Sequence, residues 1–352
     1  MSDHSTIERV IPALDSEAAE KARRHIDQLT KPPGSLGRLE EFAVQLAAMT
    51  GEPFPQISPP GILIFAGDHG VVKEGVSAFP QEVTAQMVMN FTSGGAAINV
   101  FSRHIGGLLR VVDVGVISNP EAPDIWKKKV RPGTGNMLRE DAMTRAEAER
   151  CLAVGIECAD AIIAEGARLL IIGEMGIGNT TSSSAILAAL TGADVEEIVG
   201  RGTGVTEDVL RHKKEIVKQA LEIHRPNPAD PINVLAKVGG LEIGAMAGAV
   251  IGAAARRIPI LADGFISSVA ALLAVHLHPQ ARDYLLFGHR SQEPGHARVL
   301  DELSADPILD LQLRLGEGSG AAVAFPILEA AVRMVGEMAT FDSAGVSSKS
   351  TD

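Results

Sequence analysis

The chain has 352 residues and 45% hydrophobic content, so it is long enough to bury one large core without disulfides or structural metals. Its 44 acidic residues outnumber its 32 lysines and arginines, and the formal charge of -12 argues against a general nucleic-acid or anionic-membrane surface. Aromatic residues make up only 3%, which argues against a base-stacking platform. An anionic ligand must therefore be bound locally.

The first residues, 1–6, contain no basic region followed by an apolar block, so no secretory signal is expected and a cytoplasmic location is the default. Cys151 and Cys158 lie two turns apart in an expected helix, too far for a disulfide within it, and are interpreted as buried thiols. The longest uncharged run, 243–255, is too short to span a membrane.

The two ends of the chain are expected to be helical. An amphipathic segment covers 7–28, a Pro-Pro-Gly-Ser loop lies within 31–38, and a helical run covers 39–49. The last helical pattern covers 321–338. These segments predict a small helical subdomain built from both termini.

Between the ends, short apolar runs alternate with longer helical patterns. The expected strands are 62–65, 108–114, 169–172, 258–261 and 284–287. The expected helices are 81–102, 145–165, 181–190, 207–223, 232–255 and 266–277. This alternation predicts an α/β fold with a doubly wound, mainly parallel, Rossmann-like sheet.

The predicted domain organisation has three parts. Residues 1–60 form the first part of the small helical subdomain, and 61–320 form the Rossmann-like catalytic core. Residues 321–352 supply the C-terminal helix of the subdomain and a tail, 347–352, that is expected to be disordered.

Each expected strand leads into glycine and, in most cases, an acidic residue or histidine. The first strand is followed by Asp68 and His69, the third by Glu174, the fourth by Asp263 and the last by His289. Ligands bind at the carboxyl ends of the strands in open parallel sheets. These residues therefore outline one site.

Two glycine-rich loops are suited to holding a phosphate. Residues 173–182 follow a strand and open a helix, and their backbone N–H groups can face an anion. The loop lacks the Gly-Lys-Ser/Thr ending of a nucleotide P-loop, and its spacing is G-x-x-G-x-G, which does not fit the dinucleotide fingerprint. The second loop, 200–204, precedes a helix with a basic stretch, 211–214, that a solvated helix face also explains.

Glu317 stands between glycines in the segment 314–320, directly before an alanine-rich run. A carboxylate beside apolar surface is a candidate general base with a tunable proton affinity. A glycine-rich turn at a helix start, where negative charge is favoured, explains the same pattern equally well. His69, His289 and His296 lack metal-ligand spacing, so no metal site is expected.

Six blocks of this sequence together resemble one enzyme family, the nicotinate-nucleotide:dimethylbenzimidazole phosphoribosyltransferases of cobalamin lower-ligand synthesis. The match runs in order from about residue 26 to residue 338. The blocks that carry it are Lys31–Glu40, Asp68–Val71, Gly173–Thr181, Lys237–Gly240, Leu261–Phe265 and Arg314–Ala321.

The resemblance implies transfer of phosphoribose from nicotinate mononucleotide to 5,6-dimethylbenzimidazole, giving α-ribazole 5'-phosphate and nicotinate. Glu317 matches the general base of the family, and Glu174 matches its second acidic position near the ribose and nicotinate. No cofactor and no metal are implied. Asp68, His69 and Asp263 are interpreted as residues that shape the cavity.

The resemblance also places the other ligand groups. The phosphate is expected on backbone N–H groups near Gly176 and Gly202, with Lys213 matching a family lysine that neutralises it. Asn179 and Thr180 are expected to hold the first loop by capping its helix.

The segment 76–87 matches the pocket for the incoming base. Phe79, Pro80, Met87 and Leu315 are its expected apolar wall, and some family members carry Ser and Gln where this chain has Phe79 and Met87. We therefore expect a pocket that prefers a flat, methylated benzimidazole and selects weakly among bases. These residues would equally begin a buried helix.

The resemblance further implies a homodimer in which the small domain of one subunit closes the site of the other. Two alternatives follow from the sequence pattern without it. A Rossmann-type oxidoreductase is disfavoured by the glycine spacing. A non-catalytic nucleotide-binding protein would bind ligand without turnover.

Overall fold

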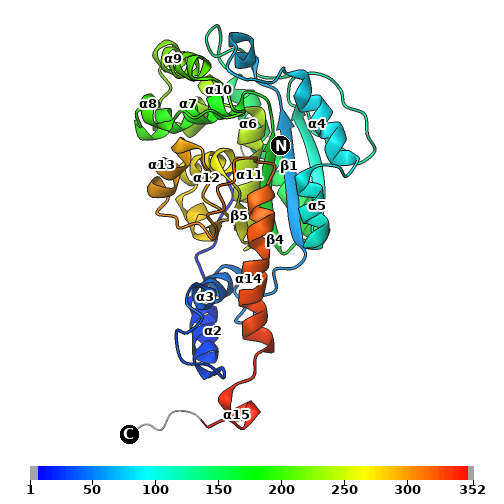
Figure 1. Ribbon diagram of the computed structural model, residues 1–352, viewed down its shortest axis with the longest axis vertical. Coiled ribbons are helices and arrows are strands. Elements are labelled where there is room, and N and C mark those ends of the chain that lie inside the picture. Colours follow the sequence, from blue (N-terminus) through cyan, green and yellow to red (C-terminus); the bar gives the residue numbers. More distant parts are fainter. Residues whose placement is uncertain (1–6, 348–352) are drawn as a thin grey trace.

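A computed structural model describes residues 7–347 and shows a parallel sheet wrapped by helices (Figure 1). The six strands are all parallel, in the order β3-β2-β1-β4-β5-β6. The predicted α/β fold is confirmed. The strands are β1 Pro60–Gly67, β2 Leu108–Gly115, β3 Ile125–Lys127, β4 Leu169–Met175, β5 Ile260–Ala262 and β6 Leu285–Phe287.

The centre of the sheet is the pair β1 and β4, whose residues are buried throughout. Ile62 pairs with Ile171 in this register. Both strands are continuous apolar runs because helices cover both faces of the sheet. The chain moves outward from β1 to β2 and β3 and then returns to β4, so the strand order reverses between β1 and β4. A ligand site is expected at this switch point.

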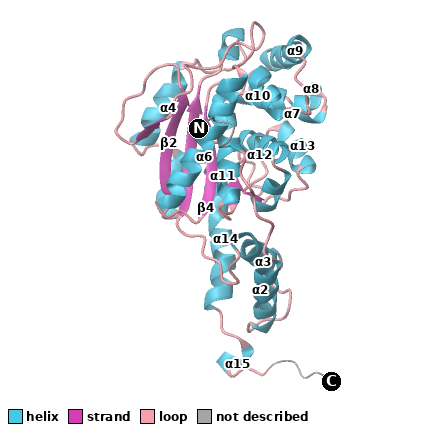
Figure 2. Cartoon of the chain, turned by 180° about the vertical axis from the view of Figure 1, so that it is seen from behind, coloured by secondary structure: helices cyan, strands magenta, loops and turns pink. Residues whose placement is uncertain are grey.

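Helices α6, α11 and α12 together contact β1, β2, β4 and β5, and α4, α5 and α14 together contact the same four strands. Figure 2 shows α6 and α11 lying across the strands. The helices are α2 Ser16–Gln28, α3 Arg38–Thr50, α4 Glu82–Thr92, α5 Ala97–His104, α6 Arg145–Ala164, α7 Asn179–Thr191, α8 Val195–Ile198, α9 Glu207–His224, α10 Pro231–Val238, α11 Leu241–Ala255, α12 Phe265–Leu277, α13 Pro294–Glu302, α14 Ser319–Glu337 and α15 Phe341–Ala344.

Two helices that were predicted to be continuous are each divided into two in the structure. The segment 81–102 is divided into α4 and α5, because Gly94 takes a left-handed conformation with φ of +79°. The segment 232–255 is divided into α10 and α11 by Gly239 and Gly240, both of which are extended. Within the expected amphipathic segment 7–28, helix α2 begins at Ser16, where the Asp15 side chain caps it by accepting a hydrogen bond from the Ala18 N–H.

The terminal helices lie together beyond one end of the sheet, with α14 packed against α2 and α3 (Figure 1). The His25 ring hydrogen-bonds the Val335 carbonyl at 3.1 Å, and Leu29 forms an isolated antiparallel β-bridge with Thr340. Helix α14 also contacts β4 and β5, so it connects this helical unit to the sheet. The predicted domain boundaries stay a prediction, and residues 1–6 and 348–352 lie outside the described part of the chain.

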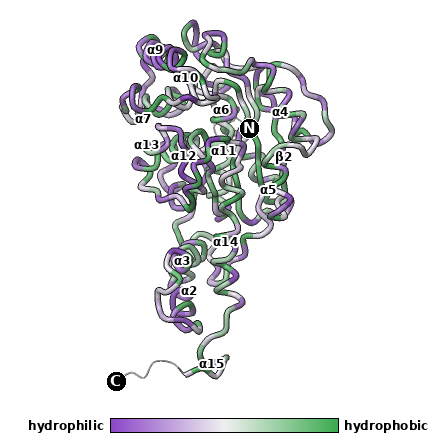
Figure 3. Tube along the Cα trace, in the orientation of Figure 1, coloured by the Kyte–Doolittle hydropathy of each residue, from purple (hydrophilic) through white to green (hydrophobic). Residues whose placement is uncertain are grey.

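Hydropathy follows this arrangement: hydrophilic stretches mark α2 and α9 on the outside, and hydrophobic ones mark the strands (Figure 3). Among the described helices, α14 alone is long and apolar enough to cross a membrane, by length and composition only. Within the molecule, 56% of its apolar window is buried, as is also found for core helices.

Candidate active site

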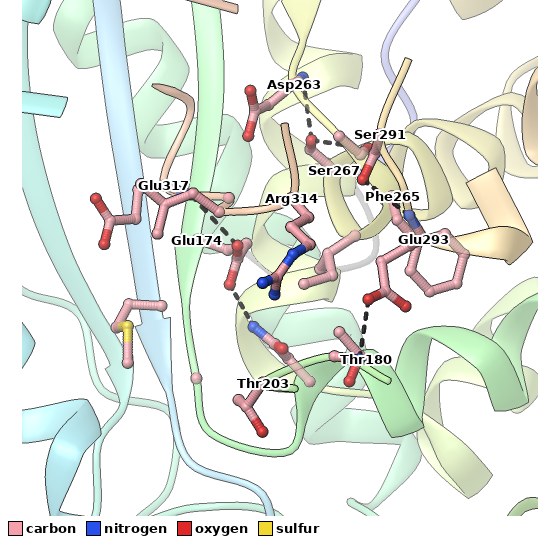
Figure 4. A pocket seen from close by; sticks show the side chains of 18 of the residues that line it. Glu174, Thr180, Thr203, Asp263, Phe265, Ser267, Ser291, Glu293, Arg314 and Glu317 are labelled. Atoms are coloured by element: carbon pink, nitrogen blue, oxygen red, sulfur yellow. Dashed lines mark hydrogen bonds between the residues drawn. The ribbon is translucent and has the colours of Figure 1, made fainter. Parts of the chain in front are cut away.

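A cavity of about 460 Å³ opens at the carboxyl ends of the central strands (Figure 4). Its wall comes from segments that are far apart in the sequence: the end of β4 and the start of α7, the 200–204 loop, the start of α12, the loop after β6, and the turn before α14. The lining residues are Phe79, Val83, Met87, Glu174, Met175, Gly176, Ile177, Asn179, Thr180, Gly202, Thr203, Asp263, Gly264, Phe265, Ile266, Ser267, His289, Ser291, Glu293, Arg314, Leu315, Gly316 and Glu317.

Glu317 is held on this wall by an unusual turn. It has a φ of 65°, between Gly316 at 91° and Gly318 at 81°, so three consecutive residues are left-handed. Only glycine takes this conformation at little cost, which explains the flanking residues. The Glu317 side chain is buried, and its Oε2 has no hydrogen-bond partner among the described residues. Burial, together with the nearby charge of Asp263, raises the pKa of Glu317 to about 7.

Asp263 fixes the turn that carries Glu317. Its carboxylate accepts hydrogen bonds from the N–H groups of Gly318 at 3.2 Å and Ala321 at 2.9 Å, so it caps α14 from the end of β5. His289 Nε2 lies 3.5 Å from the same carboxylate. Burial by itself would lower the pKa of His289, but the bond to Asp263 raises it above its usual value.

Glu174 lies at the end of β4, directly beside the Glu317 turn. The Asn179 amide donates to Glu174 Oε2, and the Glu317 N–H points to Glu174 Oε1 at 3.5 Å. A Cβ at Gly316 would lie 2.4 Å from Glu174 Oε1, so this contact requires glycine. Burial, with the charges of Glu242 and Asp263, raises the pKa of Glu174 to about 8. Figure 4 shows the Glu174 and Glu317 carboxylates projecting in different directions.

The two glycine loops meet at one end of the cavity. Gly176, Asn179 and Thr180 come from the first loop and the start of α7, and Gly202 comes from the second. The Gly202 N–H, expected to hold phosphate, donates instead to Glu293 Oε1 at 2.9 Å.

Lys213 lies behind these loops and outside the cavity wall. Its ammonium donates to Thr180 Oγ1 at 2.7 Å and to the Gly200 carbonyl at 3.2 Å, so it connects the two loops. The side chain is 1% exposed, and burial lowers its pKa to about 8. A cation is thereby placed under the loop that a phosphate would contact.

A further part of the cavity wall is apolar. It lies beside the glycine loops, because the Ala78 N–H donates to Thr203 Oγ1 at 3.1 Å and the Ile177 N–H donates to Thr84 Oγ1 at 3.1 Å. Phe79, Val83 and Met87 enter from α4 and the segment before it, facing Leu315 on the turn before α14. Phe79 is 51% exposed and Leu315 is 59% exposed, so apolar surface extends to the cavity mouth. Pro80 is exposed and does not line the cavity, although the sequence placed it in this wall.

A family model described as phosphoribosyltransferase matches residues 11–346. A protein from Chloroflexus aggregans named nicotinate-nucleotide–dimethylbenzimidazole phosphoribosyltransferase is 52% identical over 345 residues, which cover 98% of each chain. A protein of the same name from Geobacter sp. strain M21 is 52% identical and covers 96% of this chain and 97% of its own. The chain belongs to this phosphoribosyltransferase family.

Solved structures agree with the membership. The crystal structure of CobT from Thermus thermophilus has a TM-score of 0.91 and 50% sequence identity, covering 95% of this chain and 100% of that one. A second structure from the same organism, titled as the nicotinate-nucleotide-dimethylbenzimidazole phosphoribosyltransferase, has a TM-score of 0.90 and 49% identity, covering 96% of this chain and 100% of that one. The resemblance drawn from the sequence blocks is confirmed.

Two of the predicted cavity-shaping residues of this phosphoribosyltransferase lie below the cavity wall. His69 is fully buried between Ser182 and Glu242. Asp68 accepts a hydrogen bond from the Ile117 N–H at 2.8 Å, and burial raises its pKa above the usual range. Both hold neighbouring segments together at the end of β1.

The structure also brings residues into the wall that the sequence analysis did not assign. These are Val83, Met175, Ile177, Thr203, Gly264, Phe265, Ile266, Ser267, Ser291, Glu293, Arg314 and Gly316. Counting two to four residues beyond each predicted strand would have found Met175, Gly264, Phe265 and Ser291. Between residues 7 and 347, no group of three or more His, Cys, Asp or Glu side chains is arranged to hold a metal ion.

Proposed function

We propose that this protein transfers the phosphoribosyl group of nicotinate mononucleotide to 5,6-dimethylbenzimidazole, with Glu317 as the general base. The observation that carries the proposal is the buried Glu317 carboxylate, with an unpaired oxygen, on a cavity wall that also carries Glu174 and apolar side chains. Family membership supports the reaction, and this geometry supports the assignment of the base.

The chemistry needs one proton acceptor. One benzimidazole nitrogen attacks the anomeric carbon of the ribose and forms the new C–N bond, with inversion. The pyridine nitrogen of nicotinate leaves with the electrons of the old C–N bond, so its departure requires no proton. The attached benzimidazole carries a positive charge until its other nitrogen loses a proton. Glu317, with a pKa of about 7, is a stronger base than an exposed carboxylate and accepts that proton.

Glu174 is proposed to act on the sugar. Positive charge develops on the ribose as the bond to nicotinate breaks, and an ionised carboxylate nearby stabilises it. Its pKa of about 8 in the free protein favours the neutral form at pH 7. The cationic ring of the bound nucleotide favours the ionised form, so substrate binding itself brings Glu174 into its active state.

The phosphate is proposed to lie against the first turn of α7 and the 200–204 loop. Gly176 offers a backbone donor, and Thr180 contributes a hydroxyl on the cavity wall. The Gly202 N–H would have to exchange its bond to Glu293 for one to the phosphate. Asn179 keeps Glu174 in place from the same turn. Lys213 contributes its charge from below, through the loops that it connects.

The apolar part of the cavity wall, Phe79, Met87 and Leu315, is proposed to hold the incoming base. Apolar contacts favour a flat, methylated ring and discriminate weakly between rings of similar shape. Turnover with adenine equal to or faster than turnover with dimethylbenzimidazole would contradict this assignment.

The working form is proposed to be a homodimer. The loop Pro32–Gly37 is exposed on the helical unit, and Leu36 at its tip is 38% exposed. This loop lies within Lys31–Glu40, one of the sequence blocks that carry the family resemblance. Its exposure is explained if it covers the cavity of a second copy.

The direct test is to incubate the protein with nicotinate mononucleotide and dimethylbenzimidazole and to measure nicotinate and a riboside phosphate by chromatography. We expect both products in equal amounts, and only when both substrates are present. Stabilisation by the nucleotide without product would instead support a binding protein.

A further inference from the structure

A carboxylate of the protein itself occupies the part of the cavity wall where the phosphate is expected. Glu293 lines the cavity together with Gly202 and Thr180, and Figure 4 shows its carboxylate pointing toward Thr180. Its Oε1 accepts a hydrogen bond from the Gly202 N–H at 2.9 Å, and its Oε2 is buried without a partner among the described residues. Backbone N–H groups in glycine-rich turns are typical donors to phosphate. Glu293 therefore holds a donor that a bound phosphate would use.

The 200–204 loop is packed closely around this carboxylate. A Cβ at Gly200 would overlap Glu293 Oε2, and a Cβ at Gly202 would lie 3.2 Å from Lys213 Nζ. Gly202 is left-handed, with a φ of 52°. Burial lowers the pKa of Lys213, and the negative charge of Glu293 partly offsets that effect. Glu293 thus supplies the negative charge beside the buried ammonium that a phosphate would otherwise supply.

Other hydrogen bonds hold the shape of the 200–204 loop. The Lys213 ammonium donates to the Gly200 carbonyl at 3.2 Å, and the Gly204 N–H donates to the Arg201 carbonyl at 3.0 Å. Neither bond involves Glu293. The loop is therefore expected to stay in place when Glu293 leaves it.

The Glu293 carboxylate has a second position within reach. Glu293 is the N-cap residue of α13, but among the described residues its side chain makes no capping hydrogen bond. A capping side chain accepts from the second or third N–H of the helix, where the helix dipole also favours negative charge. The third N–H, of His296, already donates to the Glu293 carbonyl at 2.9 Å. The N–H of Gly295, the second residue of α13, is the donor that remains for the carboxylate.

We propose that the Glu293 carboxylate occupies the phosphate position in the free protein and moves onto the first turn of α13 when a phosphate group binds. The inference rests on the proposed function, which places the phosphate against the 200–204 loop. Glu293 then competes with every ligand that carries a phosphate, the substrate nucleotide and the product alike. The competition raises KM for the nucleotide and lets the product leave sooner, because the binding-competent form is only part of the free protein.

Two substitutions at Glu293 remove the competition in different ways. Glu293→Gln keeps the length and the acceptor but removes the charge that repels phosphate. Glu293→Asp keeps the charge, but its side chain is one methylene too short to reach Gly202, and aspartate is a strong N-cap. We expect both variants to bind inorganic phosphate at least about fivefold more tightly than the wild type in titration calorimetry. Glu302→Asp, at the other end of α13, is the matched control and should keep the wild-type affinity.

The sign of the change separates this role from a structural one. If Glu293 only anchors the loop, Glu293→Asp breaks its bond to Gly202 and phosphate binding becomes weaker. Weaker or unchanged phosphate binding in either variant overturns the proposal. With nicotinate mononucleotide, KM should fall in both variants while kcat does not rise, because the phosphate is held equally in the ground state and the transition state.

An NMR titration of the wild type decides the movement itself, even if a variant fails to fold. Inorganic phosphate should shift the amide signals of both Gly202 and Gly295, and in Glu293→Asp the Gly295 shift should be absent because α13 is already capped. A wild-type spectrum in which Gly295 does not respond overturns the proposal. Absence of product from the wild type would instead reject the proposed function, while the phosphate titrations would still decide the role of Glu293.

Discussion

Glu317 owes its position to its backbone rather than to its side chain. Three consecutive left-handed residues and the Asp263 cap direct the carboxyl group into the cavity wall, and no described residue satisfies Oε2. An unsatisfied buried oxygen is costly for folding. A ligand N–H that reaches it would recover that cost, as expected of a base whose partner is the substrate.

Replacing Glu317 by glutamine should remove the proton acceptor and keep the shape of the side chain. We expect kcat to fall by about 10²–10⁴-fold, which is the usual contribution of a general base, while the melting temperature stays at or above that of the wild type. The measurement is the initial rate of nicotinate release. Glu337→Gln, an exposed change at the far end of α14, is the matched control and should keep wild-type activity. A wild-type rate in Glu317→Gln at every pH would exclude the base assignment.

The pKa values of three residues predict a narrow pH optimum. Raising the pH through about 7 ionises Glu317, and raising it through about 8 ionises Glu174, so kcat/KM should rise over this range. Lys213 has a pKa of about 8 and loses its charge above that pH, which weakens phosphate binding and makes kcat/KM fall. Bound phosphate holds the Lys213 proton, so the alkaline fall should be absent from kcat. An alkaline fall of equal size in kcat would contradict the role of Lys213.

Glu174 should reduce stability at the pH where it assists the reaction. Its pKa of about 8 is above the ordinary 4.5, so the folded state binds its proton more tightly than the unfolded state does. The stability from this group is complete below pH 4.5 and is lost as the pH rises through 8. Glu174→Gln should therefore melt near the wild-type temperature at about pH 4.5. At about pH 9 it should melt clearly above the wild type, because its free energy of unfolding is higher by on the order of a few kcal/mol. A constant difference at both pH values would contradict this account.

At the level of elements, α6 and α11 pack with their backbones in contact. A Cβ at Gly155 would lie 1.8 Å from the Ala245 carbonyl oxygen, and one at Gly248 would lie 2.0 Å from the Leu152 carbonyl oxygen. The glycine- and alanine-rich sequence of these helices is therefore a packing requirement. Their close approach also brings the first turn of α11, with Glu242, beneath the cavity.

Gly155→Ala tests this packing. The new methyl group meets backbone rather than a flexible side chain, so the helices must separate, and we expect a loss of at least about 2 kcal/mol. Gly336→Ala on α14 is the matched control, because nothing lies within 4 Å of its Cβ position and it should stabilise by about 0.5–1 kcal/mol. Thermal unfolding of both variants gives the comparison. If Gly155→Ala and Gly336→Ala melted at the same temperature, α6 and α11 would be able to accommodate the new methyl group without loss of stability.

The sequence pattern was sufficient for elements with a strong period and failed where tertiary contacts decide. Strands β1 and β4 are long apolar runs and were predicted, whereas β3 has three residues and acquires its identity from pairing with β2. The break between α10 and α11 depends on Gly239 and Gly240, which a helical pattern tolerates. Helix α13 is short and largely polar, and it was missed.

The candidate site could likewise be predicted only in part. Glu317, Glu174 and the glycine loops carry local signals, so they could be singled out from the sequence. The bond between His69 and Glu242 joins residues 173 positions apart, and the contact of Glu293 with Gly202 joins two loops. Such pairings follow from the strand order, which local patterns do not encode.

At the scale of the whole molecule, the cavity and the exposed loop Pro32–Gly37 belong to opposite parts of one chain. The cavity lies at the carboxyl ends of the strands, and the loop lies between α2 and α3 on the helical unit at the other end of α14 (Figure 1). In the proposed homodimer, a two-fold axis would bring the loop of each chain to the cavity of the other.

Mixing two inactive variants tests this arrangement. Glu317→Gln has a defective cavity and an intact loop, and Leu36→Ser has an intact cavity and an altered loop. In a mixed dimer, the intact cavity of one chain is closed by the intact loop of the other. Random exchange makes half of the dimers mixed, each with one working site of two, so activity should recover to about a quarter of the wild type.

The recovery should appear only after subunit exchange, and light scattering should give twice the 36.9 kDa chain mass for both variants. A mixture of wild type with Glu317→Gln is the control, because both chains have an intact loop and the activity per intact cavity should stay constant. Subunit exchange itself is measured by native mass spectrometry of isotope-labelled and unlabelled chains. If both variants are dimers that exchange and the mixture remains inactive, each cavity is closed by its own chain. A monomeric mass with full wild-type activity would exclude the dimer altogether.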